Sequence, residues 1–419
     1  MRIAFVMGGI PSLGHSGSTI AAWTIVEELV AAGHDVTAVL LPETALVDES
    51  VPARIEALQR LGVDVRLVEV PPPPAPPPGR WRARAAFARS LVAPRDEELF
   101  PAARSAGGVR DALGDPRAAA ALAFGIEAIA ATAGLASPPR LAVLSHPPGV
   151  SRRLRLRYDP PRMLAGRAGE RSFLAHADRR TAALLKRFES VGVFSEHHAA
   201  WARRHGVDAW YAHYPLPDLA GPDWRERRAA GKPNPRPRIL LIGHLRGIGT
   251  ISGLHPFVRS ILPRLSEALG PDGFEVHVVG DHEPPEELRA GLGHPAVQLR
   301  GRIDEPAEEF FCCDVLLAPN PTTTGASARI LSGLTFGCCI VAHSDSLVGI
   351  PELADGENCL LAADGLGLAD ATLRALADLA LRERLGDAAR ALYERLFSPS
   401  VAARRLVREL EGLASSSER

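Results

Sequence analysis

The sequence predicts an α/β protein built from two doubly wound, Rossmann-like domains. Its 419 residues are enough for two domains of ordinary size. Apolar, strand-like runs alternate with helical patterns in both halves of the chain, and this alternation is typical of parallel sheets. In each half the first strand leads into a glycine-rich loop and then a helix, which is how such a domain begins.

The first half opens with an apolar run over 2–7, which predicts a buried strand, and a polar loop over 8–18 follows. Gly33 is placed to end the first helix. The expected elements are strands over 2–7, 34–41, 63–70 and 190–194, helices over 19–32, 52–61 and near 175–187, and apolar segments over 120–124 and 141–145.

The second half repeats this order after a segment rich in Pro, Gly, Arg and Asp, which we interpret as a linker. The predicted divisions are an N-terminal domain over 1–218, a linker over 219–237, a C-terminal domain over 238–397 and a last helix over 398–419. The expected elements are strands over 238–242, 274–279, 297–299, 315–318 and 338–342, helices over 257–269 and 328–336, and a final pair of helices between 368 and 413.

Composition excludes several functions. Lys and Arg number 48 and Asp and Glu 49, and this balance argues against a nucleic-acid binder. Only Lys186 and Lys232 are lysines, so no lysine beyond Lys232 can hold a phosphate. The five cysteines have no C-x-x-C spacing and no histidine cluster completes a metal set, so we expect buried thiols in a reduced cytoplasm and no metal. The apolar run before Gly8 is too short for a signal peptide.

The two glycine-rich loops suit a phosphate or carboxylate, because backbone N–H groups and a helix dipole meet there. The loop at 14–18 is not G-x-G-x-x-G, and the chain has no Walker lysine. A dehydrogenase and a P-loop ATPase are therefore disfavoured.

Several motifs together resemble the retaining GT-B glycosyltransferases of family 4. They are Gly17 in the first loop, Gly33–Val36 after the first helix, Gly337, Gly349–Glu352 and Asp355–Asn358. The resemblance covers nearly the whole chain. It implies a GT-B fold with two Rossmann-like domains facing a cleft, an acceptor site in the first domain and a nucleotide-sugar site in the second. It also implies that the last helix crosses back to the first domain.

The sequence departs from that family at the sugar-donor site. The family usually has two glutamates eight positions apart, where this chain has Thr324 and Ser332. The family's diphosphate-binding Arg and Lys correspond to His244 and Gly249.

A diphosphate still needs cationic or N–H partners. We therefore expect Arg329, and with it Arg246, to replace the lost cations, alongside His244. Arg329 begins a helix after the loop that contains Gly325 and Ser327. The alternative for each arginine is an ordinary surface position.

Four further side chains are candidates on the basis of the resemblance. His146, at a strand end, matches the histidine that faces the reacting sugar, and a structural histidine is the alternative. His15 is a candidate phosphate or acceptor contact. Glu127 is a candidate acceptor contact, or a residue buried at a helix start. Glu352 is a candidate sugar contact, or a helix cap.

Backbone near Gly301 and Ile303 is expected to lie against the nucleotide base. The adjacent pair His197 and His198 is expected to be a solvated helix start.

The implied reaction is transfer of a sugar from a nucleotide-diphospho sugar to a hydroxyl acceptor, with retention and without a metal or cofactor. The acceptor is a glycan, a lipid-linked intermediate or a natural product. The alternatives are a nucleotide-sugar epimerase and a catalytically degenerate scaffold. Seven prolines over 71–78 precede the basic stretch Arg80–Arg95, which is either a peripheral contact at the inner membrane face or a solvated helix.

Overall fold

A computed structural model describes residues 1–13, 17–42, 50–75, 77–114, 118–158, 164–230, 235–303, 305–321 and 325–417. The chain divides into two compact units. The N-unit is Met1–Pro215 together with Ala402–Arg419, and the C-unit is Leu216–Val401. The segment expected to be a linker, 219–237, therefore lies within the C-unit, and part of it is the helix α10 (Trp224–Ala230).

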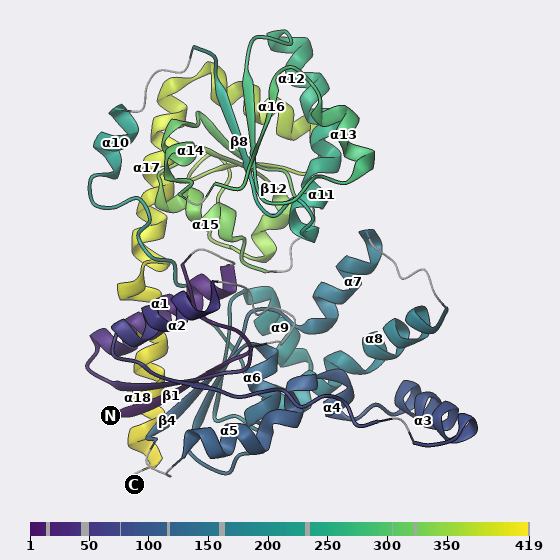
Figure 1. Ribbon diagram of the computed structural model, residues 1–419. Helices are drawn as coiled ribbons and strands as arrows, with labels where there is room; N and C mark the ends of the chain where they lie inside the picture. The colour runs from purple at the N-terminus through teal and green to yellow at the C-terminus, as the bar shows by residue number, and fades with distance from the viewer. Residues whose placement is uncertain are drawn as a thin grey trace. The chain divides into compact units, whose positions relative to one another are not determined.

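The N-unit contains a parallel sheet in the order β3-β2-β1-β4-β5-β6-β7. Figure 1 labels two of its strands, the neighbours β1 and β4. The strands of the N-unit are β1 (Arg2–Met7), β2 (Asp35–Leu40), β3 (Asp64–Leu67), β4 (Ala120–Phe124), β5 (Arg140–Leu144), β6 (Ser190–Val193) and β7 (Trp210–Tyr211). The central strands β4 and β5 are buried over their whole length, as expected where helices cover both faces of a parallel sheet. The strand order reverses between β1 and β4.

The helices of the N-unit include several that the sequence pattern did not predict, and its predicted helix near 175–187 is the end of a much longer one, α8. These helices are α1 (Gly17–Ala31), α2 (Val51–Arg60), α3 (Arg80–Val92), α4 (Asp96–Leu99), η2 (Pro101–Ser105), α5 (Ala106–Leu113), α6 (Gly125–Thr132), α7 (Pro148–Tyr158), α8 (Leu164–Leu185), α9 (Glu196–Arg204) and α18 (Arg404–Ser417).

The C-unit contains a second parallel sheet, in the order β10-β9-β8-β11-β12-β13. Its strands are β8 (Arg238–Ile242), β9 (Glu275–Val279), β10 (Val297–Gly301), β11 (Val315–Ala318), β12 (Ile340–His343) and β13 (Leu360–Ala362). The order reverses between β8 and β11, as it does between β1 and β4. The prediction of two doubly wound sheets is confirmed.

Helices again connect these strands. Besides α10, they are α11 (Ile248–Pro256), η3 (Phe257–Ile261), α12 (Leu262–Leu269), α13 (Glu286–Leu292), α14 (Ala307–Cys312), α15 (Ala328–Thr335), η4 (Ser344–Val348), α16 (Gly365–Ala377), α17 (Leu379–Leu396) and η5 (Pro399–Ala403). Where the sequence predicted a final pair of helices, the structure has α16, α17 and α18. Among the described residues, no helix combines the length and apolar character needed to cross a bilayer.

The last helix, α18, packs on the N-unit, next to α1 and β4 (Figure 1). Leu406, Val407 and Leu410 are completely buried on its inner face. Glu411 accepts a hydrogen bond from the ring of His34 at 3.0 Å. The N-unit is therefore completed by residues from the end of the chain.

Candidate functional site

The N-unit has a cavity of about 250 Å³ at the carboxyl ends of its strands. Its walls come from the ends of β1, β4 and β5, with Ser18 of α1 on one side. The cavity includes Glu127 and His146, which the sequence predicted as site residues. The strand order reverses between β1 and β4, and ligands of open α/β sheets bind at such a point.

A glycine at the end of β1 makes room for Glu127. A Cβ atom on Gly8 would lie 2.4 Å from the Cβ of Glu127, which is closer than side chains tolerate. Glu127 lies in the first turn of α6, where the helix dipole favours a carboxylate. The loop after β1 can therefore pack against Glu127 only because residue 8 is a glycine.

Two imidazoles lie close together near this cavity. Burial lowers the pKa of His146, which ends the β5 segment. His198 of α9 is only 1% exposed, so the expectation of a solvated histidine pair is wrong for this residue. Burial lowers the pKa of His198 to about 3, and the charges of His146 and His197 add to this effect. A hydrogen bond to the Ser145 carbonyl acts in the opposite direction but is weaker. Both rings are thus neutral at physiological pH and act as hydrogen-bonding groups.

In the C-unit, the corresponding position between β8 and β11 is occupied by the guanidinium of Arg329. It donates to Asn320 Oδ1 at 3.0 Å, in the segment after β11, and to Thr250 Oγ1 at 2.9 Å, in α11. Burial lowers the pKa of Arg329 to about 10, so it stays charged at neutral pH. Among the described residues both hydrogen-bond partners are neutral, and no carboxylate forms an ion pair with Arg329.

Glycines allow the loops around Arg329 to approach closely. A Cβ on Gly243 would lie 2.8 Å from Arg329 Nη2, and Gly243 has a φ of +148° that side chains disfavour. A Cβ on Gly349 would lie 2.0 Å from the Gly325 carbonyl oxygen. The predicted loop at Gly325–Ser327 therefore packs against the motif Gly349–Glu352.

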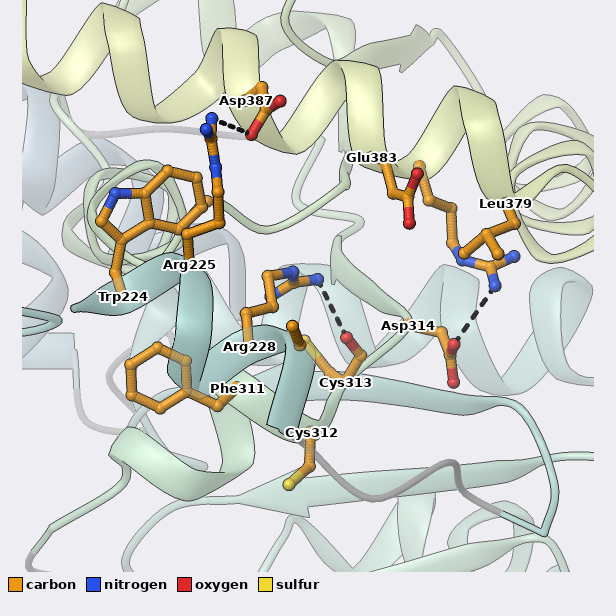
Figure 2. Close-up of a pocket in the computed structure, with 13 residues that line it drawn as sticks. Trp224, Arg225, Arg228, Phe311, Cys312, Cys313, Asp314, Leu379, Glu383 and Asp387 are labelled. Carbon is orange, nitrogen blue, oxygen red and sulfur yellow. Dashed lines mark hydrogen bonds and ion pairs between the residues drawn. The ribbon is translucent and has the colours of Figure 1, made fainter.

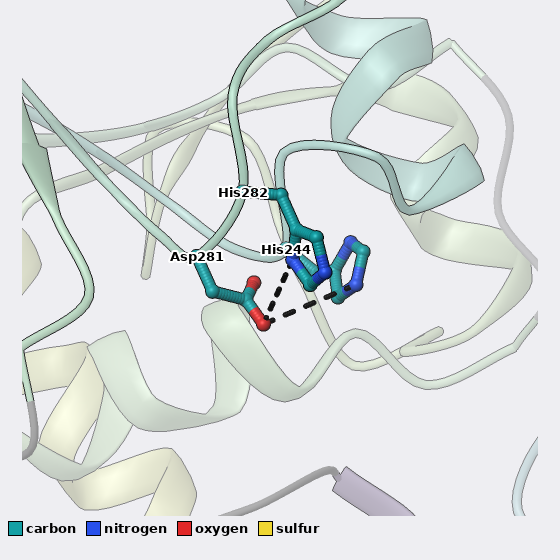
Figure 3. Close-up of side chains that lie close together, drawn as sticks. All are labelled: His244, Asp281 and His282. Atoms are coloured by element: carbon teal, nitrogen blue, oxygen red, sulfur yellow. Dashed lines mark ion pairs between the residues drawn. The ribbon is translucent and has the colours of Figure 1, made fainter. Parts of the chain in front are cut away.

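A second group in the C-unit consists of His244, after β8, and Asp281 and His282, after β9 (Figure 3). Asp281 Oδ2 lies 3.2 Å from His282 Nδ1 and 4.0 Å from His244 Nε2. The two rings stack with centroids 4.5 Å apart. His244 Nδ1 accepts the backbone N–H of Arg246 at 3.1 Å, so in this neutral ring Nε2 carries the proton.

That tautomer directs an N–H of His244 towards Asp281, whereas a metal would need a free electron pair at Nε2. The three residues, whose cluster the sequence did not predict, therefore fit a polar group around the Asp281 carboxylate better than a metal site. The Arg246 side chain donates to the Glu283 carbonyl oxygen at 3.3 Å. Arg246 is exposed, whereas Arg329 is held between two loops.

The other predicted positions lie in the C-unit, at the start of α1 in the N-unit, or outside the described residues. Gly301 ends β10, followed by Ile303, and Ser332 lies one turn beyond Arg329 in α15. The carbonyl oxygen of Glu352 accepts a hydrogen bond from Asn358. Gly17 begins α1 in the N-unit. His15 and Thr324 lie outside the described residues.

Sequence reasoning missed the residues that position the predicted ones. Asn320 and Thr250 hold Arg329, and His198 lies beside His146. The position of Asn320, two residues after a buried strand, was a usable signal. No pattern marks Thr250.

A cavity of about 630 Å³ lies at the opposite edge of the C-unit sheet, near the start of β11 (Figure 2). Arg228 of α10 donates to the Cys313 carbonyl oxygen there, and Arg382 pairs with Asp314. Its arginines are thus engaged in holding α10 and α17 on the sheet. Four of the five free cysteines, Cys313 among them, are buried as predicted, whereas Cys312 is only half-buried.

The comparisons with known proteins agree with this architecture. Residues 236–378 match a family model described as "Glycosyl transferases group 1". No curated protein matches the chain.

Three solved structures are similar over nearly their full length. Sucrose-phosphate synthase from Thermosynechococcus elongatus superposes with a TM-score of 0.69 at 16% identity, over 99% of both chains. HepE of Anabaena, in complex with UDP and glucose, gives 0.67 at 14%, over 98% of this chain and 99% of that chain. WaaG, a glycosyltransferase involved in lipopolysaccharide biosynthesis, gives 0.61 at 17%, over 98% and 100%. The chain therefore has the GT-B fold, and its C-unit contains a region similar to group 1 glycosyltransferases.

Proposed function

We propose that the protein transfers a sugar from a nucleotide-diphospho sugar to a hydroxyl acceptor, with retention of anomeric configuration. The observation that carries this proposal is Arg329. It is a half-buried cation with neutral partners among the described residues, at the point where the C-unit strand order reverses. It also lies within the region that matches the group 1 family model.

The chemistry needs a group that stabilises the departing diphosphate. Arg329 and the backbone N–H groups at the start of α15 are oriented before the reaction, so little reorganisation opposes bond cleavage. His244 would add a polar contact from the loop after β8. We propose that this set of groups acts without a metal.

The N-unit cavity would hold the reacting hydroxyl. His146 is neutral, so we assign it a hydrogen bond to a hydroxyl of the transferred sugar. Glu127, in the same cavity, would orient the acceptor hydroxyl.

Binding of nucleoside diphosphates tests this proposal. We expect one of UDP, GDP, TDP, ADP and CDP to raise the melting temperature, with a gain of about 2.7 kcal/mol at one hundred times its dissociation constant. Arg329→Gln should weaken binding at least tenfold, because a charge-assisted contact is lost. The exposed Arg264 provides the matched control, and Arg264→Gln should bind as the native protein does.

If none of the five diphosphates binds, the degenerate-scaffold alternative is favoured and the proposal fails. If a nucleotide sugar is converted into its epimer without any acceptor, the protein is an epimerase.

We also propose a peripheral contact between α3 and anionic membranes. The helix has no acidic residue and carries four arginines, and no side chain in it is buried. Trp81 is 79% exposed and Phe87 50%. Basic side chains with exposed aromatic rings fit an interface with anionic lipid.

Flotation tests this contact. The protein should float with phosphatidylglycerol vesicles and not with phosphatidylcholine vesicles, and Trp81→Ser should reduce the bound fraction several-fold. Equal behaviour with both vesicles would count against it.

A further inference from the structure

We propose that the acceptor is an alcohol with an extended apolar body, whose hydroxyl end lies in the cavity beside His146 and whose apolar body lies in an adjoining cavity of the N-unit. This inference rests on the proposed glycosyl transfer. It names the chemical class of the acceptor.

The middle cavity has a volume of about 450 Å³ and adjoins the His146 cavity, because Ile126 and Glu127 line both. Its other walls are mainly apolar and include Phe100, Phe173 and the prolines Pro71–Pro73. A polar glycan would leave many hydroxyls without partners against such walls, whereas an acyl chain or a ring system would not.

The charged residues of the middle cavity define where the hydroxyl must lie. Arg104 donates to the Pro71 carbonyl oxygen at 2.7 Å and to the Glu97 carbonyl oxygen at 2.9 Å, so it fixes the proline wall in place. Glu127 lies at the junction with the His146 cavity. The hydroxyl end of the acceptor therefore points towards Glu127, and the apolar body extends towards the prolines.

The third cavity, of about 380 Å³, lies between α3 and α8 and shares Leu99 and Phe173 with the middle one. Phe87 and Leu91 of α3 line it together with charged side chains, Glu98 and the paired Arg152 and Glu170. The α8 hydroxyl of Ser172 donates to the Leu91 carbonyl oxygen at 2.7 Å, which holds the two helices together. The third cavity is therefore too polar for the apolar body of the acceptor, which the middle cavity holds.

A series of alkyl glucosides tests the proposal, because each has the same hydroxyls and a different apolar length. Methyl, hexyl and octyl β-glucoside are titrated by calorimetry into the full chain, below their micelle-forming concentrations. We expect the affinity to rise by about fourfold per added methylene, as burial of a methylene predicts.

The proline wall provides matched variants. Pro73 and the neighbouring Pro74 are both exposed, and of the two only Pro73 lines the middle cavity. Pro73→Glu should weaken the binding of octyl glucoside at least tenfold and leave the binding of methyl glucoside unchanged. Pro74→Glu should change the binding of neither.

A second experiment compares the binding of dodecyl glucoside in phosphatidylglycerol vesicles with its binding in vesicle-free buffer. Tighter binding in the vesicles identifies the acceptor as a membrane lipid, and equal binding identifies it as a free molecule.

The outcomes separate this inference from the proposed function. The apolar acceptor is overturned if the affinity for the three glucosides does not depend on chain length, or if Pro73→Glu and Pro74→Glu have equal effects. Diphosphate binding in the same samples would then leave the transferase proposal standing. A chain-length effect without binding of any diphosphate supports the apolar site and removes the sugar-donor proposal.

Discussion

His198 shows how a residue with no distinctive sequence context enters a site. The pair His197 and His198 begins a helix, and such positions are ordinarily solvated. In the fold, β5 and α9 bring His198 beside His146, and burial keeps its ring neutral. Nothing local in the sequence specifies that contact, because it depends on two segments that are distant in the chain.

His198 should make the protein less stable in mild acid. Its pKa is about 3 when folded and 6.5 ordinarily, so between these values the unfolded chain binds more protons. The free energy of unfolding therefore falls as the pH falls, by roughly 2 kcal/mol from pH 7 to pH 5 for this residue. Urea unfolding at both pH values should show a smaller loss in His198→Gln, and the native loss in His197→Gln.

Gly8 and Gly9 form a second matched pair. Gly8→Ala places a Cβ 2.4 Å from that of Glu127, whereas Gly9→Ala meets its nearest atom at 3.8 Å. We expect Gly8→Ala to lower the free energy of unfolding by about 1–3 kcal/mol and Gly9→Ala to change it by less than about 0.5 kcal/mol. Denaturant unfolding measures both, and equal stabilities would contradict the packing described for Glu127.

Some of the site residues could be predicted from the sequence, and others could not. Arg329 could be predicted because a diphosphate needs a cation, no lysine follows Lys232, and this arginine begins a helix after a glycine loop. Its partners Thr250 and Asn320 could not, because their role depends on where two loops meet. The sequence shows which side chain has the chemistry that a diphosphate needs. The hydrogen-bond partners that orient this side chain are determined by tertiary packing.

At the scale of elements, strands were easier to predict than short helices. The apolar runs that became β1, β4 and β8 are unbroken, which is the mark of a strand covered on both faces. The helix α10 was not predicted, because it lies in a polar segment with Pro and Gly around it and this composition indicated a linker. Arg228 fixes that helix to the Cys313 and Phe310 carbonyl oxygens, and this contact is long-range.

Helix α18 should contribute strongly to the N-unit. Leu410 is completely buried, and truncating a buried leucine ordinarily costs about 2–5 kcal/mol. Leu410→Ala should therefore lower the free energy of unfolding by that amount. Leu379→Ala in α17, where the leucine is 59% exposed, should lower it by less than about 0.5 kcal/mol. If Leu410→Ala lowers the free energy of unfolding by no more than Leu379→Ala does, α18 contributes little to the stability of the N-unit.

At the scale of the whole molecule, the two units differ in how they are assembled along the chain. The C-unit is one continuous segment, Leu216–Val401, whereas the N-unit needs residues from both ends. The two side chains that we propose as contacts of the diphosphate, Arg329 and His244, both lie in the C-unit. The fragment 216–401 should therefore fold alone and bind the preferred diphosphate within about tenfold of the full chain, a difference of 1.4 kcal/mol.

The fragment 1–215 should be less stable than the N-unit in the full chain. Without α18, the surfaces that bury Leu406, Val407 and Leu410 face water. A peptide of residues 402–419 should restore part of that stability in a concentration-dependent way, because it binds only the folded fragment. Circular dichroism melts of the fragment, with and without the peptide, measure this effect. An unchanged melting temperature at saturating peptide would mean that the N-unit core is complete before the chain returns to it.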